Sequence, residues 1–494
     1  MKGKLAMMHR RTKIITTLGP ATDDEQVMSD MIDAGIDLVR LNFSHGSMEE
    51  HKRRVEMVRR ISKEKCSDIG ILGDLQGAKL RIGRFKQGKV IIQQGDQFCL
   101  DAELDLELGT SEVVGFTYKG LVDDVHAGDT LLLDDGRISL RVEAVEGPLV
   151  KTTVLVGGEL SSNKGMNRKG GGLSAACLTE KDLADIKYAK QLDLDYIAIS
   201  FLKRADDIYR VRELLKETGS DAGIVSKIET SEALEVMDDI LAASDAIMVA
   251  RGDLGVEIGD AEVPGVQKSL IAKAQTTNCC VITATQMMES MVHSPIPTRA
   301  EVSDVANAVL DGTDAVMTSG ETAVGEYPVE VVKAMSRVCR ASELQEAESG
   351  VRRIQEGDQR VDKAIAMSAM YLANHLNVAA IAALTESGTT ALWMSRISSS
   401  IPIYALTRHV KTLRRVTLYR GVFPAKLDFL GKTHAQVNHA AVAVLKESSE
   451  VIDGNLVILT KGDLMGVDGG TNAMKVLRVG HMVEEEDDPE YISK

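Results

Sequence analysis

The chain has 494 residues, of which 44% are hydrophobic and 27% charged, as is typical of a globular protein with several domains. Its formal net charge of −15 argues against nucleic acid or an anionic membrane as the main partner, although a local basic pocket could still bind an anionic metabolite. No segment approaches the length of a membrane span, and no apolar core follows the basic N-terminal residues, so we expect neither a membrane anchor nor a signal peptide.

Eight short apolar runs predict the strands of a parallel sheet, because runs of this length and composition suit strands that are buried on both faces. Amphipathic helix patterns separate most of these runs, and this alternation is typical of an α/β fold. We predict a (β/α)8 TIM barrel formed by residues 1–76 and 173–344. Its strands are expected at Lys13–Leu18, Leu38–Phe43, Ile69–Leu75, Tyr196–Phe201, Ile224–Ile228, Ala246–Ala250, Val281–Thr285 and Ala315–Thr318.

The interval between Leu75 and Tyr196 is far too long for a loop and predicts an inserted domain. We assign residues 77–172 to a small inserted β-barrel domain. It is hinged on Gly165 and Gly170–Gly172 and could close over the barrel to exclude water. Its strands are expected at Lys89–Cys99, Glu112–Val114, Thr130–Leu133, Ile138–Glu143 and Val150–Val156.

After Ser342 the sequence pattern changes, and residues 341–360 are charged and weakly apolar, as in a linker or an exposed helix. A second, smaller α/β domain is predicted over residues 345–494, and its acidic end, Glu484–Asp488, is expected to be solvated. The strands of this domain are expected at Val378–Leu384, Ile403–Ala405, Gly421–Pro424 and Leu456–Thr460.

The six cysteines are scattered without metal-ligand spacing, and Cys279 and Cys280 enter an apolar run. We interpret them as structural thiols in a reducing compartment, which predicts a cytoplasmic location.

Polar and charged residues end four of the predicted barrel strands, and the C-terminal rim is where barrels of this kind place their active sites. Glu229 and Asp253 could be an acid–base pair, part of a structural ion-pair network or ligands of Mg²⁺. Lys227 shares a strand face with Glu229, and Arg40 could hold a phosphate or form a salt bridge. Thr285 ends the seventh strand, where its hydroxyl would point into the same mouth.

Long segments of the chain, from about Thr12 to Val479, resemble the pyruvate kinase family in the same order. They are Lys13–Ala21 (KIITTLGPA), Arg40–Gly46 (RLNFSHG), Lys227–Glu229 (KIE), Met248–Ile258 (MVARGDLGVEI), Ile282–Met291 (ITATQMMESM) and Pro297–Gly312 (PTRAEVSDVANAVLDG). The resemblance implies the three-part architecture described above, assembled as a homotetramer. It also implies that the phosphoryl group of phosphoenolpyruvate is transferred to ADP, giving pyruvate and ATP.

The resemblance also implies a role for each candidate site residue. Arg40 and Lys227 would contact the phosphoryl group, and Gly252, Asp253 and Thr285 would contact the substrate. Mg²⁺, or Mn²⁺ as a substitute, would be held by Glu229 and Asp253. Thr285 is the third catalytic candidate, and it would orient a proton-delivering water because a threonine is a poor acid. The nucleotide side would consist of Asn42, Phe43, Ser44, His45, Arg81 and Lys164.

A monovalent-cation pocket is implied at Asn42, Ser44, Asp74 and the carbonyl of Leu75, but two positions differ from K⁺-dependent members. Those members have glutamate in place of Lys79 and threonine in place of Leu75, whereas K⁺-independent members resemble this chain. We therefore predict that the Lys79 ammonium supplies the charge of K⁺ near Asp74, which makes K⁺ dispensable. The alternative is that Lys79 lies on a solvated turn. Close by, Ala78 replaces the family's usual proline, which removes a rigid turn from the hinge.

A loop rich in hydroxyl groups follows the strand Val378–Leu384 and could either cap a helix or cradle a regulatory phosphate. The resemblance supports the phosphate site. Glu386 would repel a second phosphate, so we predict activation by a sugar monophosphate or AMP rather than by fructose 1,6-bisphosphate. The loop residues concerned are Thr385, Ser387, Gly388, Thr389 and Thr390.

Two other functions remain as alternatives. The first is a barrel enzyme, such as an aldolase or lyase, that handles a Mg²⁺-bound enolate and needs neither nucleotide contacts nor an inserted domain. The second is a metabolite sensor without catalysis, in which we would expect at least one of Lys227, Glu229, Asp253 and Thr285 to have been replaced.

Overall fold

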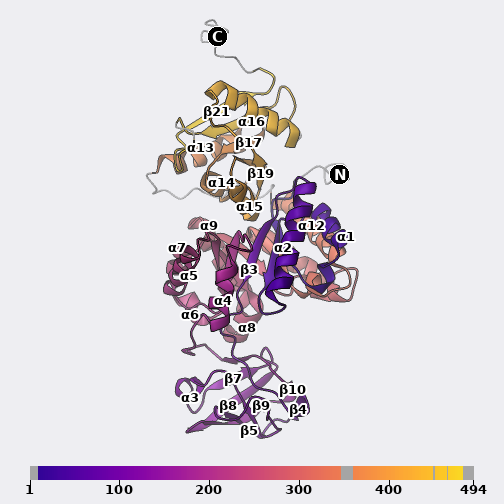
Figure 1. Cartoon of the computed structure of the whole chain (residues 1–494), viewed down its shortest axis with the longest axis vertical. Helices are drawn as coiled ribbons and strands as arrows, with labels where there is room; N and C mark the ends of the chain where they lie inside the picture. The colour runs from indigo at the N-terminus through magenta and orange to yellow at the C-terminus, as the bar shows by residue number, and fades with distance from the viewer. Residues whose placement is uncertain (1–8, 347–359, 449–450, 464–465, 482–494) are drawn as a thin grey trace.

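The computed structural model describes residues 9–346, 360–448, 451–463 and 466–481. They form a central barrel with the inserted region at one end and the C-terminal region at the other (Figure 1). The predictions for the acidic end, Glu484–Asp488, and for most of the charged segment 341–360 lie outside the described residues.

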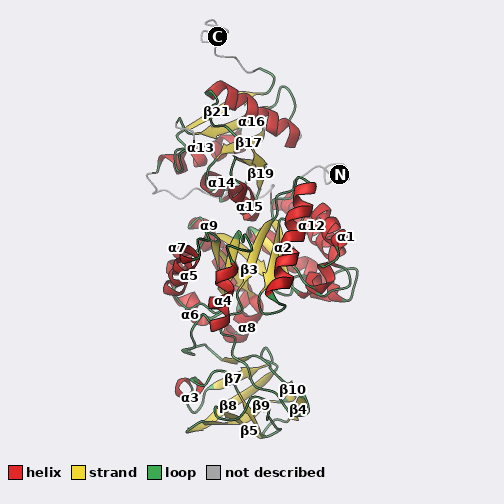
Figure 2. Cartoon of the chain, viewed as in Figure 1, coloured by secondary structure: helices red, strands yellow, loops and turns green. Residues whose placement is uncertain are grey.

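Eight parallel strands close into the central barrel, in the order β1-β16-β15-β14-β13-β12-β3-β2. The predicted TIM barrel is therefore confirmed, and each strand lies within two residues of its expected bounds. The strands are almost entirely buried because helices cover the outside of the barrel (Figure 2). They are β1 (Lys13–Thr17), β2 (Leu38–Asn42), β3 (Gly70–Asp74), β12 (Tyr196–Ile199), β13 (Gly223–Ile228), β14 (Ala246–Ala250), β15 (Cys280–Ala284) and β16 (Ala315–Thr318).

Several helices around the barrel begin at side chains that satisfy their first backbone N–H groups. Asp24 caps α1, and Ser47 and Thr298 form capping boxes at α2 and α10. No helix in the described ranges is both long and apolar enough to cross a membrane. The helices are α1 (Glu25–Ala34), α2 (Met48–Glu64), α4 (Glu180–Tyr188), α5 (Ala205–Glu217), α6 (Ser231–Glu235), α7 (Met237–Ala243), α8 (Arg251–Ile258), α9 (Val263–Thr276), α10 (Arg299–Asp311), α11 (Gly320–Ala323) and α12 (Pro328–Glu346).

The inserted region forms a six-stranded sheet, β11-β7-β8-β9-β5-β6, and a two-stranded sheet, β10-β4, around one apolar core. The single strand predicted at Lys89–Cys99 is wrong, because Gly95 adopts φ +91° and turns the chain between β4 and β5. Two short strands, β10 and β11, were not predicted. The elements are β4 (Lys89–Ile92), β5 (Gln97–Asp101), β6 (Val113–Gly115), α3 (Leu121–Asp124), β7 (Thr130–Leu133), β8 (Ile138–Glu146), β9 (Leu149–Val156), β10 (Gly158–Ser161) and β11 (Met166–Arg168).

The C-terminal region is a five-stranded sheet with helices, in the order β19-β18-β17-β20-β21, which confirms the second α/β domain. Its edge strand β21 pairs antiparallel with β20 and was not predicted. The elements are α13 (Val361–His375), β17 (Val378–Leu384), α14 (Thr389–Ser395), β18 (Ile403–Thr407), α15 (Val410–Arg415), β19 (Val422–Lys426), α16 (His434–Ser448), β20 (Leu456–Lys461) and β21 (Ala473–Arg478).

The C-terminal region closes the end of the barrel opposite the insertion, and one apolar cluster runs from the barrel strands into it. Lys13 of β1 is only 1% exposed, and its ammonium donates to the carbonyl of Val422 at 2.6 Å. The Tyr196 hydroxyl donates to the carbonyl of Arg415 at 2.8 Å. These contacts join the barrel floor directly to the C-terminal sheet.

Candidate active site

The rim of the barrel carries a row of alternating charges that the sequence could only suggest. Arg40 donates to Asp74 at 2.7 Å, and Lys227 lies 3.5 Å from the other oxygen of Asp74. Lys227 also lies 2.8 Å from Glu229. The structure thus brings together Arg40, Lys227 and Glu229, which were predicted from the ends of two separate strands, and places a buried carboxylate between the two cations.

Two hydroxyl groups that were not predicted hold these cations in position. Thr17 accepts from Arg40 at 3.0 Å, and Ser200 accepts from Lys227 at 2.6 Å. Ser200 also donates to the carbonyl of Leu75 at 2.9 Å, so that carbonyl already has a partner. Both hydroxyls stand where a barrel strand ends, at Thr17 of β1 and just after β12, which is the sequence signal that could have identified them.

Glu229 has an environment that suits a metal ligand. Burial raises the pKa of Glu229 to about 7, with Asp253 adding to this effect and Lys227 opposing it. The backbone N–H of Phe201 donates to one of its oxygens at 2.7 Å. A divalent cation would relieve the repulsion between Glu229 and Asp253, which lies in the first turn of α8.

These residues fit Mg²⁺, because that ion commonly takes one or two carboxylates and completes its octahedron with water and phosphate oxygens. Within the described residues, no group of three or more histidine, cysteine or acidic side chains is arranged to hold a metal ion. The carboxylate pair would therefore need oxygens from the substrate or from water.

Lys79 occupies a different place from the one we expected. Its ammonium lies 2.8 Å from Asp253 and 3.8 Å from Asp135. The cations beside Asp74 are instead Arg40 and Lys227. Lys79 therefore forms an ion pair with the candidate metal ligand Asp253. The alternative of an unpaired lysine on a solvated turn is wrong.

Thr285 has a strained backbone, with φ at +70°, a conformation that is rare for a β-branched residue. Its hydroxyl accepts the backbone N–H of Gly252 at 3.0 Å. That contact connects the end of β15 to the first turn of α8. The candidate substrate residues Gly252, Asp253 and Thr285 therefore lie together.

Arg251 holds the strained segment and was not identified from the sequence. Its guanidinium donates to the carbonyls of Ala284 at 3.1 Å and Thr285 at 2.6 Å, and it pairs with Asp304 at 2.6 Å. Its position between Ala250 and Gly252 in a predicted site segment was the available signal. We infer that Arg251 fixes the direction of the Thr285 hydroxyl.

The loop after β2 is shaped by local contacts. Asn42 accepts the backbone N–H of Ser44 at 3.1 Å, and the carbonyl of His45 lies 3.0 Å from a ring nitrogen of His51. The ring of Phe43 is 1% exposed and packs edge-on against His51. Asn42, Ser44 and His45 remain accessible at the rim, whereas the Phe43 side chain supports the loop from inside.

Arg81 and Lys164 come together where the inserted region joins the barrel. Arg81 is bridged to Gly165, and its guanidinium donates to the carbonyl of Asn163 at 2.9 Å. Lys164 pairs with Asp134 at 2.6 Å. Both cations of the expected nucleotide side therefore belong to the inserted region.

The return hinge consists of three glycines, and Gly170, Gly171 and Gly172 all have positive φ. A Cβ atom on Gly171 would lie 2.3 Å from the Ser231 hydroxyl, so a side chain cannot be added without a shift. Glu232 accepts the N–H of Gly172 at 2.7 Å. The hinge segment that follows β11 therefore makes specific contacts with Ser231 and Glu232 at the barrel rim.

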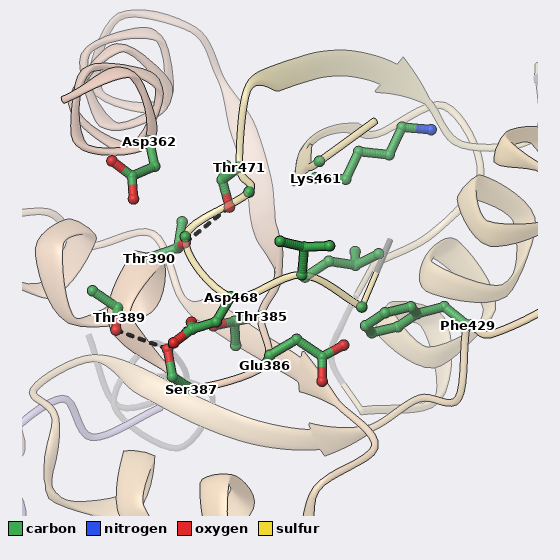
Figure 3. Close-up of a pocket in the computed structure, with 16 residues that line it drawn as sticks. Asp362, Thr385, Glu386, Ser387, Thr389, Thr390, Phe429, Lys461, Asp468 and Thr471 are labelled. Carbon is green, nitrogen blue, oxygen red and sulfur yellow. Dashed lines mark hydrogen bonds between the residues drawn. The ribbon is translucent and has the colours of Figure 1, made fainter. Parts of the chain in front are cut away.

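The predicted effector loop lines a separate cavity in the C-terminal region, shown in Figure 3. Thr385 accepts the backbone N–H of Gly388 at 2.8 Å, and the Thr390 hydroxyl lies 3.0 Å from that of Thr471. The Ser387 hydroxyl lies 2.8 Å from that of Thr389. Four of the five predicted loop residues, Thr385, Ser387, Thr389 and Thr390, therefore line one cavity, and Gly388 supports the loop through its bond to Thr385.

Comparison with known proteins gives matches along nearly the whole chain. Residues 9–332 match the family model for the pyruvate kinase barrel domain, and residues 363–477 match that for the pyruvate kinase alpha/beta domain. Pyruvate kinase II of Salmonella typhimurium is 54% identical over 95% of this chain and 99% of its own length. The pyruvate kinases of Haemophilus influenzae and of Buchnera aphidicola from Schizaphis graminum are 52% and 50% identical over 92% and 95% of this chain, and over 96% and 98% of their own lengths. With both regions matched at this level of identity, the chain belongs to the pyruvate kinase family.

Proposed function

We propose that this chain transfers the phosphoryl group of phosphoenolpyruvate to ADP, giving pyruvate and ATP, as the pyruvate kinase family does. The observation that carries the proposal is the charge row at the barrel rim, from Arg40 through Asp74 and Lys227 to Glu229. Phosphoryl transfer spreads negative charge over the phosphoryl oxygens, and a preorganised set of cations is what stabilises that charge.

In this proposal, Arg40 holds the phosphoryl group while Lys227 stabilises the charge that develops during transfer and on the enolate oxygen left behind. Thr17 and Ser200 keep both cations directed toward the rim. The Thr285 hydroxyl orients the water that protonates the enolate carbon, and Arg251 keeps that hydroxyl in place. The inserted region excludes bulk water, and its Arg81 and Lys164 face the nucleotide phosphates.

Mg²⁺, with Mn²⁺ as a substitute, would be bound by Glu229 and Asp253. When bound, it would neutralise charge on the oxygens of both substrates. Hard carboxylate oxygens support this choice, as does the raised pKa of Glu229, which indicates an environment that favours an added positive charge.

We also propose that K⁺ is dispensable, because Lys79 already supplies a tethered positive charge at the site. The structure changes the expected partner from Asp74 to Asp253. The test is activity with Mg²⁺ and tetramethylammonium, in buffer free of K⁺ and NH₄⁺. Addition of K⁺ should stimulate the wild type less than about tenfold, which corresponds to about 1.4 kcal/mol of activation free energy, and Lys79→Met more strongly. A larger effect on the wild type would contradict the proposal.

The effector site, the homotetramer and the cytoplasmic location are further proposals. The hydroxyl groups of Thr385, Ser387, Thr389 and Thr390 support binding of one phosphate, and Glu386 argues against a second. Phosphoenolpyruvate saturation curves measured with added AMP, glucose 6-phosphate or fructose 1,6-bisphosphate test the preference for a monophosphate. Sedimentation velocity tests the tetramer. Stronger activation by the bisphosphate would overturn the preference for a monophosphate.

A coupled assay that measures pyruvate tests the reaction itself. We expect pyruvate to form from phosphoenolpyruvate only when ADP is added, together with one ATP for each pyruvate. Pyruvate release that does not depend on ADP would favour the alternative of an enolate-handling barrel enzyme. A folded protein that binds phosphorylated metabolites but forms no pyruvate would favour the sensor.

A further inference from the structure

The C-terminal cavity has a carboxylate of its own beside its hydroxyl groups. Asp468 accepts a hydrogen bond from the Ser387 hydroxyl at 2.6 Å, and Ser387 in turn lies 2.8 Å from the Thr389 hydroxyl. Figure 3 shows the side chain of Asp468 pointing toward these two side chains. A carboxylate and a phosphate are both anionic oxygen acceptors, so they compete for the same donors.

The other carboxylates of the cavity have cationic partners. Asp362 pairs with Arg360 at 2.7 Å, and Glu386 lies 3.3 Å from Arg408 and also contacts His409. Within the described residues, Asp468 has no such ion pair, and Ser387 is its hydrogen-bond donor.

The lysine of the cavity wall does not neutralise Asp468. The Lys461 ammonium donates to Asn438 at 2.9 Å, and Figure 3 shows its side chain leading away from the loop. A phosphate that enters the hydroxyl cluster therefore meets the charge of Asp468 at close range.

We propose that Asp468 is a built-in competitor that lowers the affinity of this cavity for phosphate esters and sets the ligand concentration at which the site responds. This proposal rests on the proposed effector site and states how the affinity of that site for its ligand is set. A phosphate monoester binds only when the Asp468 carboxylate leaves Ser387, so the free protein is held in the unliganded form by one of its own side chains.

The chain provides its own reporter for a test, because it has a single tryptophan. Trp393 lies on α14, directly after the loop, and is 6% exposed. The Arg360 guanidinium lies over its ring, 4.9 Å from the centroid, and also pairs with Asp362 of the cavity. A ligand in the cavity is therefore expected to change Trp393 fluorescence.

The experiment titrates the full-length enzyme with inorganic phosphate and with glucose 6-phosphate, using glucose as the ligand without phosphate. Asp468→Asn keeps the size of the side chain and removes its charge. Asp463→Asn is the matched control, because Asp463 contacts Asn472 in the same loop and lies outside the cavity lining. Calorimetry measures the same affinities independently, and thermal unfolding verifies that each variant is folded.

We expect Asp468→Asn to bind both phosphate probes at least about tenfold more tightly than the wild type, which corresponds to about 1.4 kcal/mol, and Asp463→Asn to bind like the wild type. Equal or weaker binding by Asp468→Asn, with the wild type still binding, overturns the inference and leaves the effector site standing. If neither binds either probe, the proposed effector site fails and the competitor with it. Ser387→Ala should weaken binding in both backgrounds. If Asp468→Asn does not fold, Asp468→Ser serves the same comparison.

Discussion

Replacement of Lys227 by methionine should remove most of the catalytic rate. Burial alone would lower the pKa of Lys227, but Asp74 and Glu229 raise it above the usual value, so the side chain is charged in the buried site. A positive charge about 4 Å from a developing negative charge contributes about 4 kcal/mol at an effective dielectric constant of about 20. That energy corresponds to roughly three orders of magnitude in kcat.

Binding of phosphoenolpyruvate should change little in Lys227→Met, because Arg40 and the divalent cation remain. The assay therefore measures kcat and KM separately with saturating ADP and Mg²⁺. Lys187→Met, at an exposed position on α4, is the control for removal of one lysine charge. Near-normal kcat with a greatly raised KM would refute the reasoning and assign Lys227 to ground-state binding.

Loss of Lys227 should also affect folding, because it leaves Glu229 and Asp74 as buried carboxylates with one fewer cation. Breaking a buried pair in this way typically costs about 3–5 kcal/mol. Kinetics should therefore be measured well below the melting temperature of the variant. Circular dichroism at the assay temperature then separates a catalytic loss from an unfolded fraction.

Three further predictions follow from the same region. Burial raises the pKa of Glu229 to about 7, so the folded protein binds this proton more tightly than the unfolded chain does. The free energy of unfolding without metal should therefore fall as the pH rises from about 4.5 to 7. Urea unfolding should show a smaller fall for Glu229→Gln and for the wild type with Mg²⁺, and an unchanged fall would contradict the assignment. Arg251→Lys should lower kcat about 10- to 100-fold with little change in KM for ADP, because one ammonium nitrogen cannot reproduce the planar, forked geometry with which the guanidinium bonds both carbonyls and Asp304. An equal rise in KM would argue against positioning of Thr285. Gly171→Ala should change kcat and KM together, because φ of +73° and the Ser231 hydroxyl oppose a side chain at the hinge. Unchanged kinetics would show that the close approach of Gly171 to Ser231 is not needed for turnover.

The barrel was predictable because its strands are buried on both faces and are therefore mostly apolar, with their polar residues gathered chiefly at the strand ends. The inserted region was harder: the segment Gln93–Asp96 (QQGD) has no apolar side chain and turns at Gly95, but the prediction joined β4 and β5 across it. β21 (Ala473–Arg478) was missed because an exposed edge strand can carry charges, and here Lys475 and Arg478 are exposed.

The site was predictable where a strand end fixes the position of a side chain, as at Arg40 and Glu229. Contacts between distant segments were not predictable, and Ser200 at Lys227 is an example. The partner of Lys79 depends on the path of the hinge, which a sequence pattern does not contain. Asp74 and Asp253 were therefore indistinguishable as its partner until the fold was known.

The buried contact between Lys13 and the carbonyl of Val422 makes the two regions interdependent. Without the C-terminal region, Lys13 would lose that acceptor and the apolar side chains at the base of the barrel would face water. The barrel is therefore not a module that can be excised, and a truncated chain ending near residue 346 is expected to aggregate. The barrel and the C-terminal region therefore share one core, so a mutation at the junction should affect both the barrel rim and the C-terminal cavity.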